Sequence, residues 1–467
     1  MNESHSIRTA FDRFIHSAVF PLLFGATVLL GYAFKLEFYG NILLFCIVFL
    51  GLWLSDSPRP FLTLAFFFVF QVPLLHSPSF PYYSTYYFDT GKIVIIGILA
   101  VALVLSLIVY SVRTRLFSTV RKTGSPLFVP LLLHGAVFLL NGVGSSEYIL
   151  ENVIIGVVQL LVWVYFYFFL LAGFQKEKHD SLLNYLLECV FIQAWIILSE
   201  ILLLFVENPA AMTDGVIDRS VFNFGWGTCN ACGVCLTVLI PLCFYCFLQG
   251  KYRLFSLFTA VLCYLGSILP LSRNALLFGT LAVIGCFIVS ISKKYKNHRK
   301  FFKIFTVIDI LIVVALLIFF REPIHDLFVC ILERGTESNG RIEIWRSAIT
   351  SFTESPVFGK GFFGVQPELM AYVDFFPNFV HNTPLQFLGS AGAVGLLIYL
   401  FYRYRTARVL LQRKTLLRLC MTISICVFLG ESLLDVFPFM IYPTFLYSAL
   451  LAYAEVENKN AFVRENM

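Results

Sequence analysis

Charged residues are scarce in this chain. Asp, Glu, Lys and Arg together make up 13% of its 467 residues, whereas 59% are hydrophobic and 52 are Phe. Soluble domains have about 25% charged and about 45–50% apolar residues. An apolar excess that extends over the whole length cannot be hidden in one soluble core. The composition therefore argues against a soluble protein and predicts one whose solvent is the lipid bilayer.

The sequence gives no indication of a signal peptide, a disulfide scaffold or a complete metal site. Residues 14–34 have no small-residue cleavage site and are long enough to span a membrane, so they are interpreted as a first helix rather than a signal peptide. The 12 Cys are scattered, mostly inside apolar segments, which argues against a disulfide scaffold. Cys229, Cys232 and Cys235 have a spacing that suggests a metal site, but no fourth ligand stands nearby. We therefore predict no metal, no cofactor and no nucleic-acid partner.

Apolar runs of about twenty residues recur along the chain and predict an all-α, polytopic protein of about fourteen transmembrane helices. We divide it into an N-terminal bundle (1–206), a second membrane unit (207–454) and a cytoplasmic tail (455–467). The predicted helices are 14–34, 38–54, 61–75, 91–112, 126–142, 152–174, 182–206, 228–248, 254–270, 273–291, 301–320, 381–402, 417–435 and 438–454.

The connections between these segments alternate in positive charge. Lys and Arg concentrate in every second connection, and cytoplasmic loops of membrane proteins carry such an excess. With both termini inside, nine of the 34 Lys and Arg fall outside: Lys35, Lys92, Arg219, Arg273, Arg321, Arg334, Arg341, Arg346 and Lys360. The pattern predicts an inner-membrane protein with cytoplasmic termini and an even number of spans.

Two of the predicted outer connections are long, 207–227 and 321–380. The larger one is expected to form short helices. Ile342, Trp345 and Ile349 share one face, as in an amphipathic helix at the membrane surface. The glycines of 359–364 predict a flexible turn after it. Loops of this length between spans usually have a function, so their charged and polar residues are candidates for the site.

Three arginines on the outer side are candidate phosphate ligands. Arg273 begins a predicted helix, and Arg341 and Arg346 lie in the larger outer loop. A planar guanidinium matches phosphate oxygens and stays charged at any relevant pH. The plainer alternative is that all three only contact lipid headgroups, as interfacial arginines often do.

A histidine and two acidic residues complete the candidate set. His381 opens the helix after the larger loop, where a neutral imidazole can take a proton from a sugar hydroxyl, with Asn382 orienting it or binding sugar. A lone His is more often structural. Glu431 and Asp435 are spaced by four residues near the outer end of a predicted helix. They are candidates for binding acceptor hydroxyls or, equally, for a proton relay.

Four short motifs occur in order along the second unit. They are Gly225-Trp226-Gly227-Thr228-Cys229-Asn230, Ser272-Arg273-Asn274-Ala275, Gly340-Arg341-Ile342-Glu343-Ile344-Trp345 with Ser355-Pro356-Val357-Phe358-Gly359-Lys360-Gly361, and His381-Asn382-Thr383-Pro384-Leu385 with Gly389, Gly392 and Gly395. With the long outer loop between them, they resemble the O-antigen ligase and polymerase family of integral-membrane glycosyltransferases. The resemblance covers roughly residues 215–435.

This resemblance implies a GT-C-like fold with one large extracytoplasmic loop and an undecaprenyl-diphosphate-linked glycan as donor. The family's diphosphate-binding arginines match Arg273 and Arg341, and its catalytic histidine matches His381. Asn230 joins Arg346, Asn382, Glu431 and Asp435 as an expected substrate-binding residue. Asn274 departs from the family, in which a smaller residue commonly follows the arginine.

The function expected from the resemblance is metal-independent, inverting transfer on the outer face of the bacterial inner membrane. A polymerase of repeat units into O-antigen, capsule or exopolysaccharide is the preferred reading, and a ligase onto lipid A core or another acceptor is the alternative. The candidate partners are the bilayer, the lipid-linked donor, the glycan or lipid-linked acceptor, a chain-length regulator and a flippase. A flippase or transporter is a third reading, which the long outer loop and the absence of an internal repeat disfavour.

Overall fold

The computed structural model describes residues 2–67, 90–146, 148–207, 222, 229–291, 341–365 and 379–465. These residues form helices and turns, with no strand among them, which confirms the predicted all-α class for this part of the chain. The predicted helix 301–320 lies outside the described residues, as do most of the connection 207–227, the end of the predicted helix 61–75 and two parts of the larger outer loop, 321–340 and 366–378.

Within the described residues, seven helical stretches are long and apolar enough to cross a membrane, which confirms a multi-pass membrane protein. An eighth is possible if α1 (Asn2–Ile15) and α2 (Val19–Phe34), bent by 69° between them, form one broken span. The count of about fourteen and the GT-C-like layout stay predictions. The seven are α3 (Glu37–Leu54), α6 (Thr90–Arg113), α9 to α10 (Leu150–Phe174), α11 (His179–Glu207), α12 to α13 (Cys229–Gln249), α15 (Arg273–Ile291) and α19 (Thr383–Leu411).

The remaining helices are shorter, or less apolar. The last one, α21, continues to Glu465 instead of ending at residue 454 as predicted, and the acidic residues just after 454 have partners in the bundle. Glu455 accepts a hydrogen bond from Tyr167 at 2.7 Å, and Glu457 pairs with Arg418. The helices that are shorter or less apolar than the seven spans are α4 (Arg59–Phe67), α7 (Leu116–Thr123), α8 (Phe128–Leu140), α14 (Arg253–Ile268), α18 (Arg341–Glu354), α20 (Leu416–Glu431) and α21 (Ile441–Glu465).

The interior of the bundle is built around α12 and α13. Every residue of the apolar window in Cys229–Gln249 is buried, against α14, α15 and α20, whereas only 22% of the corresponding window of α6 is. A helix that is apolar all round and fully buried belongs in the centre of a large bundle. Cys232 and Cys235 lie in this core as small buried side chains.

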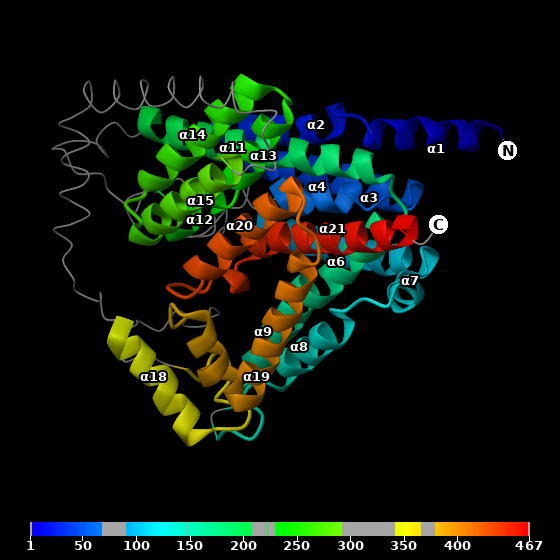
Figure 1. Cartoon of the computed structure of the whole chain (residues 1–467). Helices are drawn as coiled ribbons and strands as arrows, with labels where there is room; N and C mark the ends of the chain where they lie inside the picture. The colour runs from blue at the N-terminus through cyan, green and yellow to red at the C-terminus, as the bar shows by residue number, and fades with distance from the viewer. Residues whose placement is uncertain are drawn as a thin grey trace.

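The helix ends on one side of the bundle carry many Lys and Arg residues. We call this side the basic end. Arg113 at the end of α6 donates to the carbonyls of Leu52 and Ser55 at the end of α3, and Lys176 donates to the carbonyl of Thr114. Figure 1 shows α1, α7 and the end of α21 on this side of the molecule.

The opposite helix ends form the site end. Here Lys35, after α2, pairs with Glu207 at the end of α11 at 2.9 Å. The 29 residues of α11 span about 44 Å between the two ends, more than the roughly 30 Å of a bilayer's hydrocarbon core. In Figure 1, α12, α15 and α18 lie on this side.

Candidate active site

The start of α19 explains why His381 stands at the mouth of a helix. Asn382 is the N-cap: its side-chain oxygen accepts a hydrogen bond from the backbone N–H of Leu385 at 3.0 Å, and Pro384 occupies the first turn. Both residue types favour these positions, because Asn satisfies a free N–H and Pro has none to satisfy. The helix therefore begins at Thr383, and His381 lies just outside it.

His381 is held in an uncommon backbone conformation. Its φ is +50°, in the left-handed region that a non-glycine residue rarely occupies. The turn after α20 holds the segment in place: Thr383 N–H donates to the carbonyl of Ser432 at 3.0 Å, and Asn382 Nδ2 donates to the carbonyl of Leu433 at 2.8 Å. Such strain persists where surrounding contacts fix it, and it is concentrated at functional sites.

The imidazole of His381 contacts a buried carboxylate. Its Nδ1 lies 3.0 Å from Oδ1 of Asp435, whose side chain is 2% exposed, while the His381 side chain is 31% exposed. Asp435 Oδ1 also accepts the N–H of Val436 at 2.9 Å, and Oδ2 accepts from Asn230 Nδ2 at 3.2 Å. An ionised carboxylate is acceptor-only, so Nδ1 carries the proton in this pair, and Nε2 of the neutral imidazole is then the acceptor nitrogen.

Arg341 is electrostatically coupled to this pair. Burial alone would raise the pKa of Asp435, but the hydrogen bond from His381 and the positive charges of His381 and Arg341 lower it. Asp435 therefore stays ionised in a nearly closed environment. The half-buried Arg341 lies on the first described turn of α18.

Arg273 lies at the same end of the bundle, on a neighbouring helix. It is the first residue of α15, its side chain is exposed, and Ser272 before it accepts the N–H of Ala275. A Cβ built on Gly233 would lie 2.5 Å from Cβ of Ala275, so α12 and the start of α15 touch one turn beyond Asn230. Helix α12 thus contacts the start of α15, which carries Arg273, and it also carries Asn230, which donates a hydrogen bond to Asp435.

The segment after α18 is fixed to α19 rather than flexible, which corrects the expectation of a flexible turn. The N–H groups of Lys360 and Gly361 donate to the carbonyls of Gly389 and Ser390, both at 2.9 Å. A Cβ on Gly392 would lie 2.3 Å from the carbonyl oxygen of Val357. The glycines permit this close approach of two backbones, and Gly392, with φ +66°, also kinks α19.

Helix α18 packs through a face other than the one that its large apolar residues suggested. Ile344 and Ala348 are buried against α19 and its neighbours, whereas Ile342 and Ile349 are each about half exposed. The exposed pair is compatible with the predicted contact with lipid. Arg346 is exposed as well, and nothing in the described contacts joins it to the His381–Asp435 pair.

Glu431 lies near Asp435 but is enclosed by the bundle. It is fully buried at the end of α20, and its Oε1 accepts a hydrogen bond from Thr237 at 2.6 Å. Helix α20 ends at Glu431, so Asp435 lies in the following turn and not on the same helix as predicted. The expected binding of acceptor hydroxyls by Glu431 and Asp435 stays a prediction.

The structure therefore brings Asn230, Arg341, His381 and Asp435 into one group, with Arg273 adjacent through α12. The sequence did not reveal that Asp435 is the partner of His381. The available signal was an acidic residue near the outer end of one apolar segment and a histidine at the outer end of another, but nothing in the sequence pairs these two ends.

Fold and site together define a multi-pass helical membrane protein with a histidine–carboxylate pair and arginines at one end of its bundle. A family model described as O-antigen ligase matches residues 257–400. The match includes Arg273, Arg341, Arg346, His381 and Asn382. This match confirms the predicted resemblance to the O-antigen ligase and polymerase family and supports a transferase in general. No curated protein matches the chain in sequence.

Proposed function

We propose that the chain is an inverting, metal-independent glycosyltransferase that moves a glycan from undecaprenyl diphosphate to an acceptor hydroxyl on the outer face of the inner membrane. The observation that carries the proposal is the 3.0 Å contact between His381 and Asp435, at the same end of the bundle as Arg273 and Arg341.

The pair supplies the base. With the proton held on Nδ1 by Asp435, Nε2 of His381 accepts the proton of the acceptor hydroxyl, a contribution worth about 10²–10⁴-fold in rate. The acceptor oxygen forms its bond to the anomeric carbon from the face opposite the diphosphate. The bond from that carbon to the diphosphate oxygen breaks, its electron pair leaves with undecaprenyl diphosphate, and the configuration inverts.

The arginines stabilise the leaving group. Charge builds on the diphosphate as the bond breaks, and fixed guanidinium groups in a site with little water stabilise that charge by several kcal/mol each. Arg273 begins α15, where the free N–H groups of the first turn and the helix dipole also favour an anion.

Two forms of this reaction differ in the acceptor that receives the glycan. We propose a polymerase, in which the acceptor is a second lipid-linked repeat unit. The alternative is a ligase with lipid A core or another acceptor, and the family match supports both forms equally. Incubating purified protein with lipid-linked repeat units alone separates the two, because a polymerase then produces a ladder of longer glycans and a ligase produces none.

The decisive experiment uses purified protein in detergent, with lipid-diphosphate oligosaccharide, acceptor and no ion gradient. We expect release of undecaprenyl diphosphate, its loss in His381→Ala, and normal release in Arg121→Ala, an exposed arginine on α7 at the opposite end. Near-normal turnover by His381→Ala would refute the assigned base. Lipid movement across vesicles without any glycan transfer would favour the flippase reading.

A further inference from the structure

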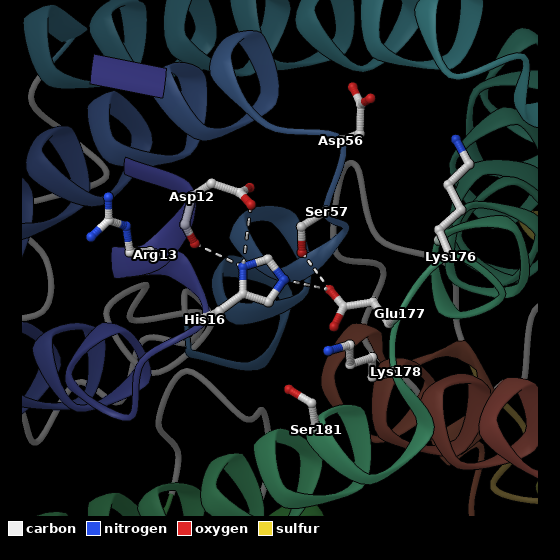
Figure 2. Close-up of a pocket in the computed structure, with 10 residues that line it drawn as sticks. Asp12, Arg13, His16, Asp56, Ser57, Lys176, Glu177, Lys178 and Ser181 are labelled. Carbon is white, nitrogen blue, oxygen red and sulfur yellow. Dashed lines mark hydrogen bonds and ion pairs between the residues drawn. The ribbon is translucent and has the colours of Figure 1, made fainter. Parts of the chain in front are cut away.

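A second polar site lies at the basic end, far from His381. It is a pocket of about 440 Å³ where the hinge between α1 and α2 meets the α3–α4 and α10–α11 turns. Its lining residues are Asp12, Arg13, His16, Asp56, Ser57, Gly173, Lys176, Glu177, Lys178 and Ser181, as Figure 2 shows.

The most buried acid in this pocket is already neutralised. Glu177 accepts hydrogen bonds from Arg59 Nη2 and from Ser57 Oγ, both at 2.6 Å, and His16 Nε2 lies 3.4 Å from its Oε1. Arg59 and Glu177 have side-chain exposures of 2% and 5%, so this ion pair forms the floor of the pocket. A paired carboxylate of this kind does not repel an incoming anion as a free one would.

The second acid is neutralised as well. Asp56 lies 3.2 Å from Arg113 Nε and 3.7 Å from Arg8 Nη2. The third, Asp12, accepts a hydrogen bond from Ser55 Oγ at 2.6 Å. All three carboxylates thus have partners within the described structure.

Three cations on the rim have no carboxylate partner among the described residues. Arg13, Lys176 and Lys178 are exposed, and the only hydrogen bond shown for a side chain among them is from Lys176 to the carbonyl of Thr114. Figure 2 shows Arg13 on one side of the His16 ring and the two lysines on the other. The lining itself has three Arg or Lys side chains and three carboxylates. Arg8, Arg59 and Arg113, which pair with two of these carboxylates, bring the local count to six cations against three acids, an excess that favours an anion.

We propose that this pocket binds the phosphate of a small organic phosphate ester, of the size of a phospholipid headgroup. Its volume suits a small organic ligand rather than a bare ion. Basic pockets between helix ends on the cytoplasmic side hold anionic headgroups, and the same chemistry accommodates a soluble phosphate ester. The proposal is independent of the transfer reaction, since it uses none of the residues at the site end.

The test compares two double variants of the purified full-length protein that remove the same charge. Lys176→Ala with Lys178→Ala alters the pocket, whereas Arg121→Ala with Lys122→Ala removes two exposed cations from α7 at the same end. Binding of phosphatidylglycerol, with diacylglycerol as the lipid lacking phosphate, is measured by native mass spectrometry. Binding of glycerol 3-phosphate, with glycerol as its control, is measured by calorimetry.

We expect the pocket variant to bind the phosphate ligand about tenfold more weakly, and the α7 variant to bind it as the wild type does. Preference for phosphatidylglycerol assigns the pocket to a lipid headgroup, and preference for glycerol 3-phosphate assigns it to a soluble ester. A third variant, Arg13→Gln, should weaken the same ligand. Equal binding by both double variants in both arms would overturn the proposal.

Discussion

Asp435 is almost completely buried and yet ionised, because hydrogen bonds from three elements converge on its carboxylate. They come from His381 before α19, from Asn230 on α12 and from the backbone N–H of Val436. In the proposed reaction, a carboxylate with these donors acts as a positioning group: it would fix which nitrogen of the imidazole carries the proton and stabilise the imidazolium that forms.

Replacing Asp435 by Asn tests this role. The amide has nearly the same shape but no charge, and it can offer an N–H where the carboxylate accepted one, so Nε2 of His381 no longer stays free. We expect kcat for glycan transfer to fall about 10²–10⁴-fold, with KM changed much less. The yield and melting temperature of the variant show whether it folds. A pH profile and kcat equal to those of the wild type would contradict the assigned role.

His16 predicts a pH dependence at the other end of the molecule. The hydrogen bond to Glu177 raises its pKa from 6.5, with Asp12 adding to the effect and burial and Arg59 opposing it. Burial would raise the pKa of Glu177, but His16, Arg59 and Ser57 lower it to about 2. The His16 contribution to stability is therefore present below pH 6.5 and lost as pH rises through its raised pKa. The Glu177 contribution is present above pH 4.5 and lost toward pH 2.

The contact between His16 and Glu177 should therefore stabilise the protein most at about pH 5–6. The melting temperatures of wild type and His16→Gln in detergent should differ most there and converge by about pH 9. A difference that stays constant over this range would show that the stabilising interaction is not the ionised pair.

Among the helices, α19 and the segment 355–363 behave as one element. Backbone hydrogen bonds join the segment to both sides of the kink at Gly392, including Ala393 N–H to the carbonyl of Pro356 at 2.8 Å. Asn141 of the α8–α9 turn adds a hydrogen bond to the N–H of Phe362 at 3.1 Å. The kink thus fixes the direction of the first turns of α19, which begin beside His381.

Gly392→Ala should disrupt this element. The new Cβ would meet the Val357 carbonyl oxygen at 2.3 Å, and the left-handed backbone adds its own penalty. We expect a loss of about 2–5 kcal/mol in unfolding free energy together with reduced transfer. The matched control is Gly97→Ala on α6, where nothing lies within 4 Å and the change should be neutral or stabilising by up to about 1 kcal/mol. Equal stability of the two variants would contradict the argument.

The same element shows what the sequence can predict and what it cannot. The start of α19 follows from local chemistry, since Asn382 and Pro384 are typical of a helix N-terminus. The packing face of α18 does not, because Ala348 is too small to stand out in a hydrophobic pattern. The role of Gly359 as a close-approach residue and the pairing of Asp435 with His381 both depend on partners distant in sequence.

At the scale of the whole molecule, the two polar sites lie at opposite ends of one bundle. Helix α11 contributes to both ends, with Ser181 lining the pocket in its first turn and Glu207 paired with Lys35 at its last residue. Within the described residues, the basic α6–α7 and α10–α11 connections lie at the end that holds the pocket, and the α8–α9 turn, which is poor in Lys and Arg, contacts the segment 355–363 that packs on α19. If the positive-inside tendency holds for this chain, the pocket faces the cytoplasm and His381 faces outward.

Cysteine accessibility tests this orientation directly. Thr350 on α18 and Lys122 on α7 are both exposed, and they lie at the site end and the basic end respectively. A membrane-impermeant maleimide applied to spheroplasts should label Thr350→Cys at once and Lys122→Cys only after the membrane is opened, with the unsubstituted chain showing the background from its own thiols. Labelling in the reverse order would place His381 and Asp435 on the cytoplasmic side, opposite to the face on which we propose that the transfer takes place. That outcome would rule out glycan transfer on the outer face.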